Sequence, residues 1–441
     1  MLTLIYGSDI MVRQYFLTGR SLKMQQNEKR GYRGTVIACY IAYMVQALVN
    51  NTSPLLFVLY QSEYNISLQM LANIILINFG TQFVFDLISI KLIDIFGYRK
   101  LSVACHIISA LGLIGLGIFP KIMPPSIGLV IATLLCAVGG GLIEVIISPI
   151  VDAIPNESKS ASMNFLHSFY CWGSVFCVAV GTVAVKLLGN MWYILPICLS
   201  AIPLFNSVAF MRAKFAKSTE DNVRVPAKKL LRSPFFILLM IIMICGGASE
   251  LVISQWASLF AEKALGISKV AGDILGPCLF AFFMGTGRML SGVLSKKIKI
   301  EKIMLVCAVL CTLCYIGTAL LPGVFALATC ALTGFGVSLM WPATLSVASA
   351  HFDGAGTTLF SILAFAGDIG CAFGPWLSGN ISDLVEGNSA FSSVADSLSL
   401  TTEQLGLRSG ILVSAIFPII IFFSLTAVLA YEKKHREKSL I

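Results

Sequence analysis

Residues 212–232, RAKFAKSTEDNVRVPAKKLLR, determine how this chain is organised. The stretch is rich in basic side chains, which are Arg212, Lys214, Lys217, Arg224, Lys228, Lys229 and Arg232. The regions on both sides of it are strongly apolar. Over the whole chain 57% of the residues are hydrophobic and 12% are charged, whereas a soluble domain has roughly 25% charged residues. The sequence therefore predicts two apolar halves joined by a basic loop.

Each half contains runs that are long enough to cross a bilayer, for which a helix needs about 20 mostly apolar residues. We expect spans near 34–60, 68–93, 101–120, 125–153, 161–187, 190–211, 234–261, 272–295, 303–322, 324–350, 356–380 and 409–431. The runs are continuous and lack the alternation of a barrel strand, so they predict helices. The predicted fold is an all-α membrane protein with twelve transmembrane helices in two pseudo-symmetric six-helix bundles.

The same pattern predicts domain boundaries and topology. We expect an N-terminal tail at 1–33, bundles at 34–211 and 234–431, a basic linker at 212–233 and a C-terminal tail at 432–441. Arg13 and Arg20 interrupt any apolar core in residues 1–23, so no signal peptide is predicted there. With the N-terminus in the cytoplasm, most of the 31 Lys and Arg residues fall on the cytoplasmic side. We therefore expect a multi-pass plasma-membrane protein with both termini cytoplasmic, and a net charge of +9 that reflects topology rather than nucleic-acid binding.

The two halves share a weak internal repeat. Gly139–Gly141 in the fourth span and Gly334 in the tenth are each followed by a proline, at Pro149 and Pro342. A shift of the second span into the eighth brings Asp86 onto Arg288. Repeated halves of this kind are common in secondary transporters, in which the substrate site lies between the halves near the bilayer midplane.

Two motifs carry a family resemblance. The loop DIFGYRK, from Asp94 to Lys100, resembles the signature that follows the second span in the major facilitator superfamily. The fourth span, with Glu144 five residues before Pro149, is similar to the fucose-permease branch of sugar-proton symporters. The resemblance implies the superfamily's fold and a cavity lined by spans one, four, seven and ten. The chain departs from that branch in its first span, where residues 50–54 read NNTSP and contain no carboxylate.

Ionisable side chains inside spans are costly and are therefore functional candidates. Glu144, Glu250 and His167 are the predicted proton-coupling residues, since a carboxyl or an imidazole can exchange a proton when water reaches it. A hydrogen-bonded structural role is the alternative for each of them.

Polar and aromatic side chains near these groups are the predicted substrate-binding residues. Amides hydrogen-bond to hydroxyl groups, and aromatic rings contact the C–H faces of a cyclic polyol. The predicted set is Gln46, Asn50, Asn51, Glu144, Tyr170, Glu250, Ser254, Gln255, Trp256 and Trp341.

A third group is predicted to act as a conformational gate. It comprises Asp86, Asp94, Gly97, Arg99, Arg288 and Asp368. Arg288 needs an acidic partner inside the membrane, and Asp368 in the eleventh span is the expected one. The charged loop that contains Asp94 and Arg99 is expected to latch the halves together.

Several classes of protein are not expected. No phosphate-binding loop is present, so we do not expect ATP to be the energy source. No soluble stretch is long enough for an enzyme domain, so we expect no enzyme activity and no cofactor. Cys307, Cys311 and Cys314 share a helical face but have no His or carboxylate beside them, so no metal site is predicted.

The favoured hypothesis is a monomeric transporter that moves a small polar solute, a sugar or polyol, together with a proton by alternating access. Oxygen atoms at Asn50, Asn51 and Thr52 leave sodium open as the coupling ion. A second hypothesis is a proton-coupled efflux antiporter of amphipathic compounds, and a third is a non-transporting membrane sensor on the same fold.

Overall fold

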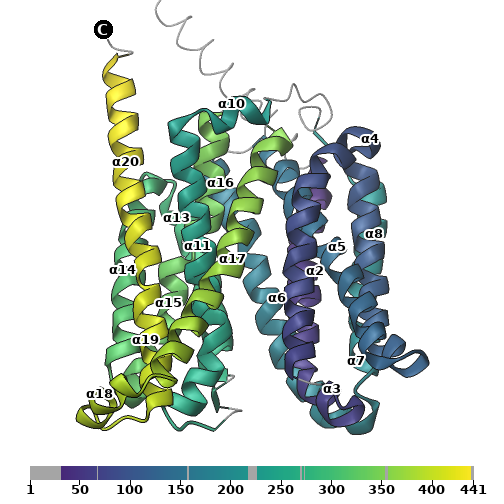
Figure 1. The fold of residues 1–441 in the computed structure, drawn as a ribbon. Coiled ribbons are helices and arrows are strands. Elements are labelled where there is room, and N and C mark those ends of the chain that lie inside the picture. Colours follow the sequence, from purple (N-terminus) through teal and green to yellow (C-terminus); the bar gives the residue numbers. More distant parts are fainter. Residues whose placement is uncertain are drawn as a thin grey trace, which may run out of the picture.

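The chain forms two helical bundles that lie side by side (Figure 1). The computed structural model describes residues 31–66, 68–155, 158–216, 226–268, 271–272, 274–352 and 356–438. Most of the predicted N-terminal tail, residues 217–225 of the predicted linker and residues 439–441 of the predicted C-terminal tail lie outside the described residues. The predicted domain boundaries stay a prediction.

The first bundle contains the helices before the basic loop. They are α2 (Arg33–Leu55), α3 (Phe57–Tyr64), α4 (Leu68–Ile122), α5 (Pro125–Ala153), α6 (Lys159–Leu188), the 3-10 turn η1 (Gly189–Met191), α7 (Ile194–Leu199) and α8 (Ala201–Arg212). A short helix, α10 (Ala227–Leu231), lies in the loop that leads to the second bundle.

The second bundle contains the remaining helices. They are α11 (Pro234–Leu259), η2 (Phe260–Ala264), η3 (Ile274–Cys278), α13 (Leu279–Leu294), α14 (Ile300–Leu320), α15 (Gly323–Val337), α16 (Met340–His351), α17 (Gly356–Glu386), η4 (Ser389–Phe391), α18 (Ser392–Ser397), α19 (Thr402–Ser414) and α20 (Ile416–Lys438).

The predicted twelve-helix membrane fold is confirmed. Within the described residues, ten helices are long and apolar enough to cross a membrane. One of them, α4, has 55 residues, which is about 80 Å of helix at 1.5 Å per residue, and it crosses twice because the chain reverses at Gly97. Helix α2 continues into α3 and adds one more crossing. These crossings make six in each bundle.

The reversal of α4 occurs at Gly97, within the predicted gate motif. Gly97 has a φ of 73°, a left-handed conformation that a side chain would strain. The glycine therefore separates the second and third crossings without an intervening loop. Its observed role is in the backbone turn.

Several observed helix ends differ from the predicted ones. Helix α19 begins at Thr402, before the predicted span at 409, since Thr401 and Gln404 form a reciprocal capping box. The tenth crossing is split between α15 and α16 around Ser338 and Leu339. The first crossing continues past Pro54 as far as Tyr64.

The backbones of α11 and α17 approach closely. A Cβ atom at Gly370 of α17 would overlap the carbonyl oxygen of Ile244 on α11, and a Cβ at Gly374 would lie 2.7 Å from the Cα of Ala248. Small residues permit such close helix packing in membranes, where dispersion contacts and hydrogen bonds hold helices together. This seam fixes the position of Asp368, which lies on α17 two residues before Gly370.

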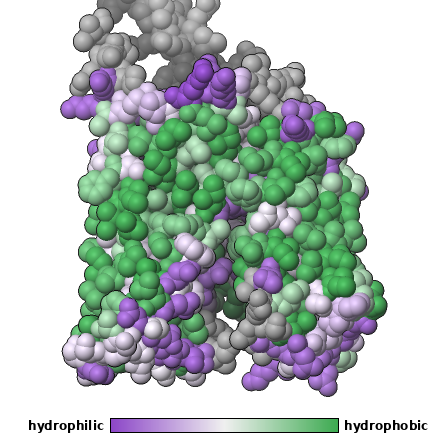
Figure 2. Space-filling model, in the orientation of Figure 1, coloured by the Kyte–Doolittle hydropathy of each residue, from purple (hydrophilic) through white to green (hydrophobic). Residues whose placement is uncertain are grey.

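The surface around both bundles is apolar (Figure 2). Large hydrophobic side chains are exposed there, including Leu187, Phe205 and Val306, which are 80%, 78% and 68% exposed. An apolar band of this extent would be unstable in water and is what a lipid bilayer covers. The chain is therefore a multi-pass membrane protein.

One end of the molecule, here called the basic face, carries Arg99, Lys100, Lys228, Lys296 and Lys433. It is the upper end in Figure 1, where α10 and the end of α20 lie. The other end, here called the opposite face, includes α3 and α18.

The halves are closed at the basic face. A single cluster of buried apolar side chains includes Ile146 of α5, Phe236 of α11 and Leu363 of α17, so it joins both bundles. The Phe83 and Phe365 rings lie 4.4 Å apart across the same boundary. Toward the opposite face the core divides: one cluster contains only residues of the first bundle, and another, apart from Cys171, only residues of the second.

Candidate functional site

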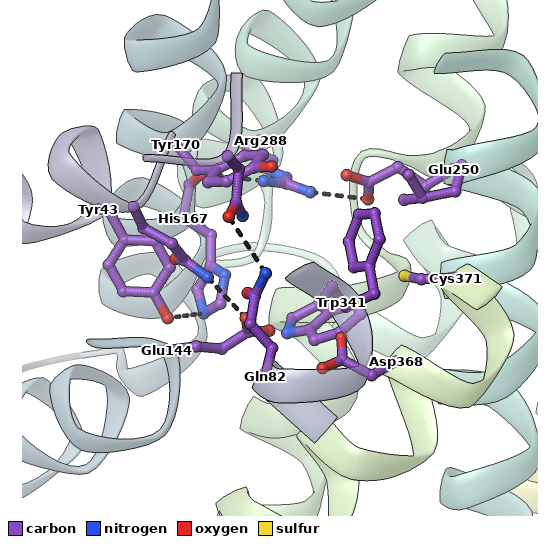
Figure 3. A pocket seen from close by; sticks show the side chains of 14 residues that line it. Tyr43, Gln82, Glu144, His167, Tyr170, Glu250, Arg288, Trp341, Asp368 and Cys371 are labelled. Atoms are coloured by element: carbon purple, nitrogen blue, oxygen red, sulfur yellow. Dashed lines mark hydrogen bonds and ion pairs between the residues drawn. The ribbon is translucent and has the colours of Figure 1, made fainter. Parts of the chain in front are cut away.

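A polar cavity lies between the two bundles (Figure 3). The space between its walls, including the part open to solvent, is about 520 Å³. Its lining comes from both bundles and consists of Tyr43, Gln46, Asn50, Phe79, Gln82, Glu144, His167, Tyr170, Glu250, Leu251, Arg288, Trp341, Asp368 and Cys371. The cavity is called the central cavity below.

Glu144 projects into the central cavity from α5, which glycines bring close to two helices. A Cβ atom at Gly140 would lie 3.1 Å from Val49 of α2, and one at Gly141 would lie 3.1 Å from Gln82 of α4. The amide of Gln46, on α2, donates a hydrogen bond to Glu144 Oε2 at 2.6 Å. Gln46 is only 4% exposed. The amide therefore fixes the position of the carboxyl without supplying a positive charge.

His167 belongs to a buried polar cluster beside Glu144. Its Nε2 lies 3.1 Å from the Tyr43 hydroxyl and 3.3 Å from Ser148 Oγ, and these two hydroxyls are 2.7 Å apart. The Tyr43 and His167 rings also pack at a centroid distance of 4.5 Å. These contacts orient the imidazole.

Arg288 joins the two halves at the central cavity. Its Nη2 lies 3.2 Å from Glu250 Oε2 on α11, and its Nη1 donates to the His167 carbonyl oxygen on α6 at 2.9 Å. Its Nε donates to the Ser338 carbonyl oxygen, also at 2.9 Å. The guanidinium is 3% exposed and therefore needs this set of acceptors.

Amides and aromatic rings complete the lining. The Gln82 amide donates to Asn50 Oδ1 at 3.2 Å, and the Tyr170 hydroxyl hydrogen-bonds to Asn50 as well. The Trp341 ring lines the same space as Gln82 and Asp368 (Figure 3). The cavity thus offers hydrogen-bonding groups next to ring faces.

A second cavity continues from the central cavity toward the opposite face. The two share Asn50, Phe79, Tyr170 and Leu251, and the space of the second, including the part open to solvent, is about 980 Å³. Its other lining residues are Val49, Asn51, Ser53, Pro54, Phe57, Ile74, Ile75, Asn78, Leu116, Thr133, Cys136, Ser254 and Gln255. A hollow between the halves is visible below the middle of Figure 2. The route into the site therefore runs from the opposite face.

The structure brings most of the predicted binding and proton-coupling residues to these two cavities. Gln46, Asn50, Glu144, His167, Tyr170, Glu250 and Trp341 line the central cavity, and Asn51, Ser254 and Gln255 line the second. Trp256 lines neither: its Nε1 donates to the Pro375 carbonyl oxygen on α17 at 3.2 Å. The tryptophan was expected to be a substrate platform, but its contacts are with the neighbouring helix.

The predicted gate residues divide into two groups. Arg288 and Asp368 line the central cavity, but Arg288 pairs with Glu250 and not with the expected Asp368. Arg99 lies at the basic face, where its Nη1 donates to the Met211 carbonyl oxygen at 2.8 Å and its guanidinium lies 4.9 Å from the Phe215 ring centre. This contact does not latch the two halves, because Met211 belongs to the same bundle.

The sequence reasoning missed five lining residues: Tyr43, Phe79, Gln82, Leu251 and Cys371. A signal for Tyr43 was present, since residues 43, 46 and 50 share one helical face. Gln82 is an amide inside an apolar span and is a candidate on the same grounds as Asn50. The apolar Phe79 and Leu251 carry no such signal.

Two six-helix bundles around a polar central cavity define a membrane transport protein. The Major Facilitator Superfamily model matches residues 39–375, and the chain belongs to that superfamily. A search of curated proteins finds no match.

Solved structures share the fold at low sequence identity. A single-residue variant of the Escherichia coli fucose:proton symporter FucP is 15% identical, with a TM-score of 0.70 over 90% of this chain and 99% of its own. FucP in the outward conformation is 15% identical, with a TM-score of 0.71 and the same coverage of both chains. The proton:xylose symporter XylE, bound to 6-bromo-6-deoxy-D-glucose, is 12% identical, with a TM-score of 0.70 over 90% of this chain and 96% of its own.

Proposed function

We propose that this protein is a secondary active transporter that moves a small polar solute, a sugar or polyol, together with a proton by alternating access. The observation that carries the proposal is the Glu144 carboxyl, which lies in the central cavity between the halves. Within the described residues its hydrogen-bond donor is the neutral Gln46 amide. A carboxyl held in this way can bind a proton when the cavity is open and release it when the other side opens.

The substrate class follows from the lining. Asn50, Gln82 and Gln46 supply amide donors and acceptors, which suit the hydroxyl groups of a polyol. Tyr170 and Trp341 supply aromatic faces that suit the C–H side of a sugar ring. The printed functions of FucP and XylE, a fucose:proton and a proton:xylose symporter, support the same class.

The orientation in the membrane is part of the proposal. The basic face is cytoplasmic by the positive-inside rule, so the chain acts in the plasma membrane with both termini inside and the second cavity open to the outside. A reporter that is active only in the cytoplasm tests this when it is fused to the C-terminus; an inactive but folded fusion would contradict it. The transporter acts as a monomer, which light scattering in detergent tests; a dimer mass would contradict it.

An excess of carboxyl groups favours a second candidate. Glu144, Glu250 and Asp368 line the central cavity together with a single guanidinium, that of Arg288. Such a cavity also suits an amphipathic organic cation that leaves the cell in exchange for a proton. The two candidates differ in the direction of solute movement, since a proton gradient directed into the vesicle drives solute in by symport and out by antiport.

Uptake into proteoliposomes tests the proposal. We expect one member of a panel of hexoses, deoxyhexoses and polyols to accumulate when an inward proton gradient is imposed, and not in a gradient-free control. Accumulation driven by an inward sodium gradient at equal pH would identify sodium, and not the proton, as the coupling ion. No uptake of any panel member by folded protein would reject the sugar class.

A further inference from the structure

Two carboxyl groups from different halves meet at the interface between α4 and α17. Asp86 belongs to α4 and is 0% exposed, and Asp368 belongs to α17 and is 5% exposed. The two side chains lie within hydrogen-bonding reach of each other. Asp368 lines the central cavity, whereas Asp86 is not part of its lining. Water in the cavity therefore reaches the pair through Asp368.

Among the described residues, no donor compensates the Asp86 carboxyl. In the described part of the chain, both oxygens of Asp86 and Oδ2 of Asp368 accept no hydrogen bond from a donor. The hydroxyl groups of Ser89 and Ser361 are engaged elsewhere: Ser89 Oγ donates to the Asp86 main-chain oxygen at 2.6 Å and lies 3.2 Å from Ser361 Oγ. An ionised carboxyl accepts hydrogen bonds but cannot donate one, so two carboxylates cannot satisfy each other.

The charged groups that face the pair do not neutralise it. Glu144 of α5 adds negative charge near the pair, and Cys371 is the next titratable group on α17. The positive charge in the central cavity is that of Arg288, which is paired with Glu250 at 3.2 Å. Two neighbouring carboxyls in such surroundings cannot both ionise at an acceptable cost.

The pair also lies in the part of the molecule that must separate when the basic face opens. The Phe83–Phe365 ring contact and the Ser89–Ser361 hydroxyl contact both join α4 to α17 around it. On the opposite side of the molecule the halves enclose the second cavity instead. Opening at the basic face would therefore expose the pair to water.

We propose that Asp86 and Asp368 share one proton, and that this pair is a proton-binding site distinct from Glu144 that holds the halves together at the basic face. The shared proton makes the hydrogen bond between the two oxygens. When α4 and α17 separate, water solvates both carboxylates and the proton passes to the water at the basic face. This inference rests on the proposed transport function for its role, but the proton itself is measurable without transport.

Infrared spectroscopy of the purified protein in nanodiscs tests the pair directly. A protonated carboxylic acid gives a carbonyl band that a carboxylate lacks. We expect Asp86→Asn and Asp368→Asn, which lie on different helices, each to remove the same band, because the new amide donates to the remaining carboxylate. The double variant should lose no more of the band intensity than either single variant does. The control Glu144→Gln should leave this band in place.

A band that persists in either single variant, or losses that add in the double variant, would overturn the shared proton. Hydrogen exchange of the α4 and α17 amides gives a second readout in the same samples. Exchange corrected for its intrinsic base-catalysed rise should increase with pH in the wild-type protein and in the control Ser361→Ala, since loss of the proton makes the carboxylates repel. After the same correction it should not change with pH in Asp86→Asn.

The outcomes also distinguish a shared proton from a bound sodium ion, and they separate failure of this proposal from failure of the proposed transport function. A band that disappears when sodium replaces potassium at fixed pH would assign the pair to a cation and overturn the proposal. Absence of solute uptake together with the expected band would reject the transport function and leave the proton site standing. Solute uptake without the expected band would reject the proton site alone.

Discussion

Glu250→Gln isolates the energetic role of the buried ion pair in the central cavity. The substitution keeps the shape of the side chain but removes the charge that lies 3.2 Å from Arg288 Nη2. Arg288 then retains two carbonyl acceptors, those of His167 and Ser338. The side chains of Arg288 and Glu250 are 3% and 13% exposed, so water compensates little.

The expected cost is large. At 3.2 Å and an effective dielectric constant of about 20, Coulomb's law gives about 5 kcal/mol for the lost attraction. The retained carbonyl acceptors reduce the effect, and breaking one partner of a buried pair costs roughly 3–5 kcal/mol in other proteins. We expect Glu250→Gln to destabilise the protein by about 3 kcal/mol.

Melting curves of the purified protein in detergent, recorded at one scan rate, measure the effect. The matched control is Glu403→Gln, which removes one partner of the exposed pair with Lys263 at 3.9 Å and should cost no more than about 1 kcal/mol. The double variant Arg288→Met with Glu250→Leu removes both charges and should be more stable than Glu250→Gln. A Glu250→Gln protein as stable as the Glu403→Gln control would refute the reasoning.

Four further predictions concern the cavity and the helix packing. Glu144→Gln should abolish uphill accumulation but leave exchange of labelled for unlabelled solute, because exchange releases no net proton. Trp341→Ala should weaken solute binding roughly tenfold, as expected for the loss of an aromatic contact worth about 1.4 kcal/mol. Trp256→Ala should leave affinity unchanged and lower stability by on the order of 1–2 kcal/mol, since its ring and Nε1 contact α17. Gly370→Ala should give little folded protein, because its Cβ would overlap the Ile244 carbonyl.

Each of these predictions has a contrary result. Loss of exchange in Glu144→Gln would assign the carboxyl to binding or folding, and retained accumulation would remove it from coupling. Equal binding losses in Trp341→Ala and Trp256→Ala would contradict the placement of the two rings. A Gly370→Ala protein with the melting temperature of the wild type would contradict the close approach of α11 and α17. Solute binding is measured by calorimetry, and folded yield by size-exclusion chromatography.

The membrane fold could be predicted from the sequence because its physical cause is local. A run of about 20 apolar residues without charges crosses a bilayer whatever its neighbours are. The ends of the helices were predicted less well, since they depend on caps such as the Thr401–Gln404 box and on the turn at Gly97. These features act over a few residues and leave hydropathy unchanged.

The sequence predicted those site residues that the energetic cost of a charge inside the membrane is enough to identify. Glu144, Glu250 and Arg288 stand out because a charge inside a span is expensive wherever the helix packs. Their partners depend on packing, so the expected pairing of Arg288 with Asp368 was wrong and Glu250 takes that place. Trp256 shows the same limit, because its side of α11 faces Pro375 rather than the cavity.

The most direct test of the central proposal is solute-driven proton movement in proteoliposomes that contain a trapped pH dye. With no pH gradient at the start, addition of the transported solute outside should acidify the lumen in wild-type vesicles. The same addition should produce no pH change in Glu144→Gln vesicles that still exchange solute. Solute entry into wild-type vesicles without any change in lumenal pH would contradict proton symport through this cavity.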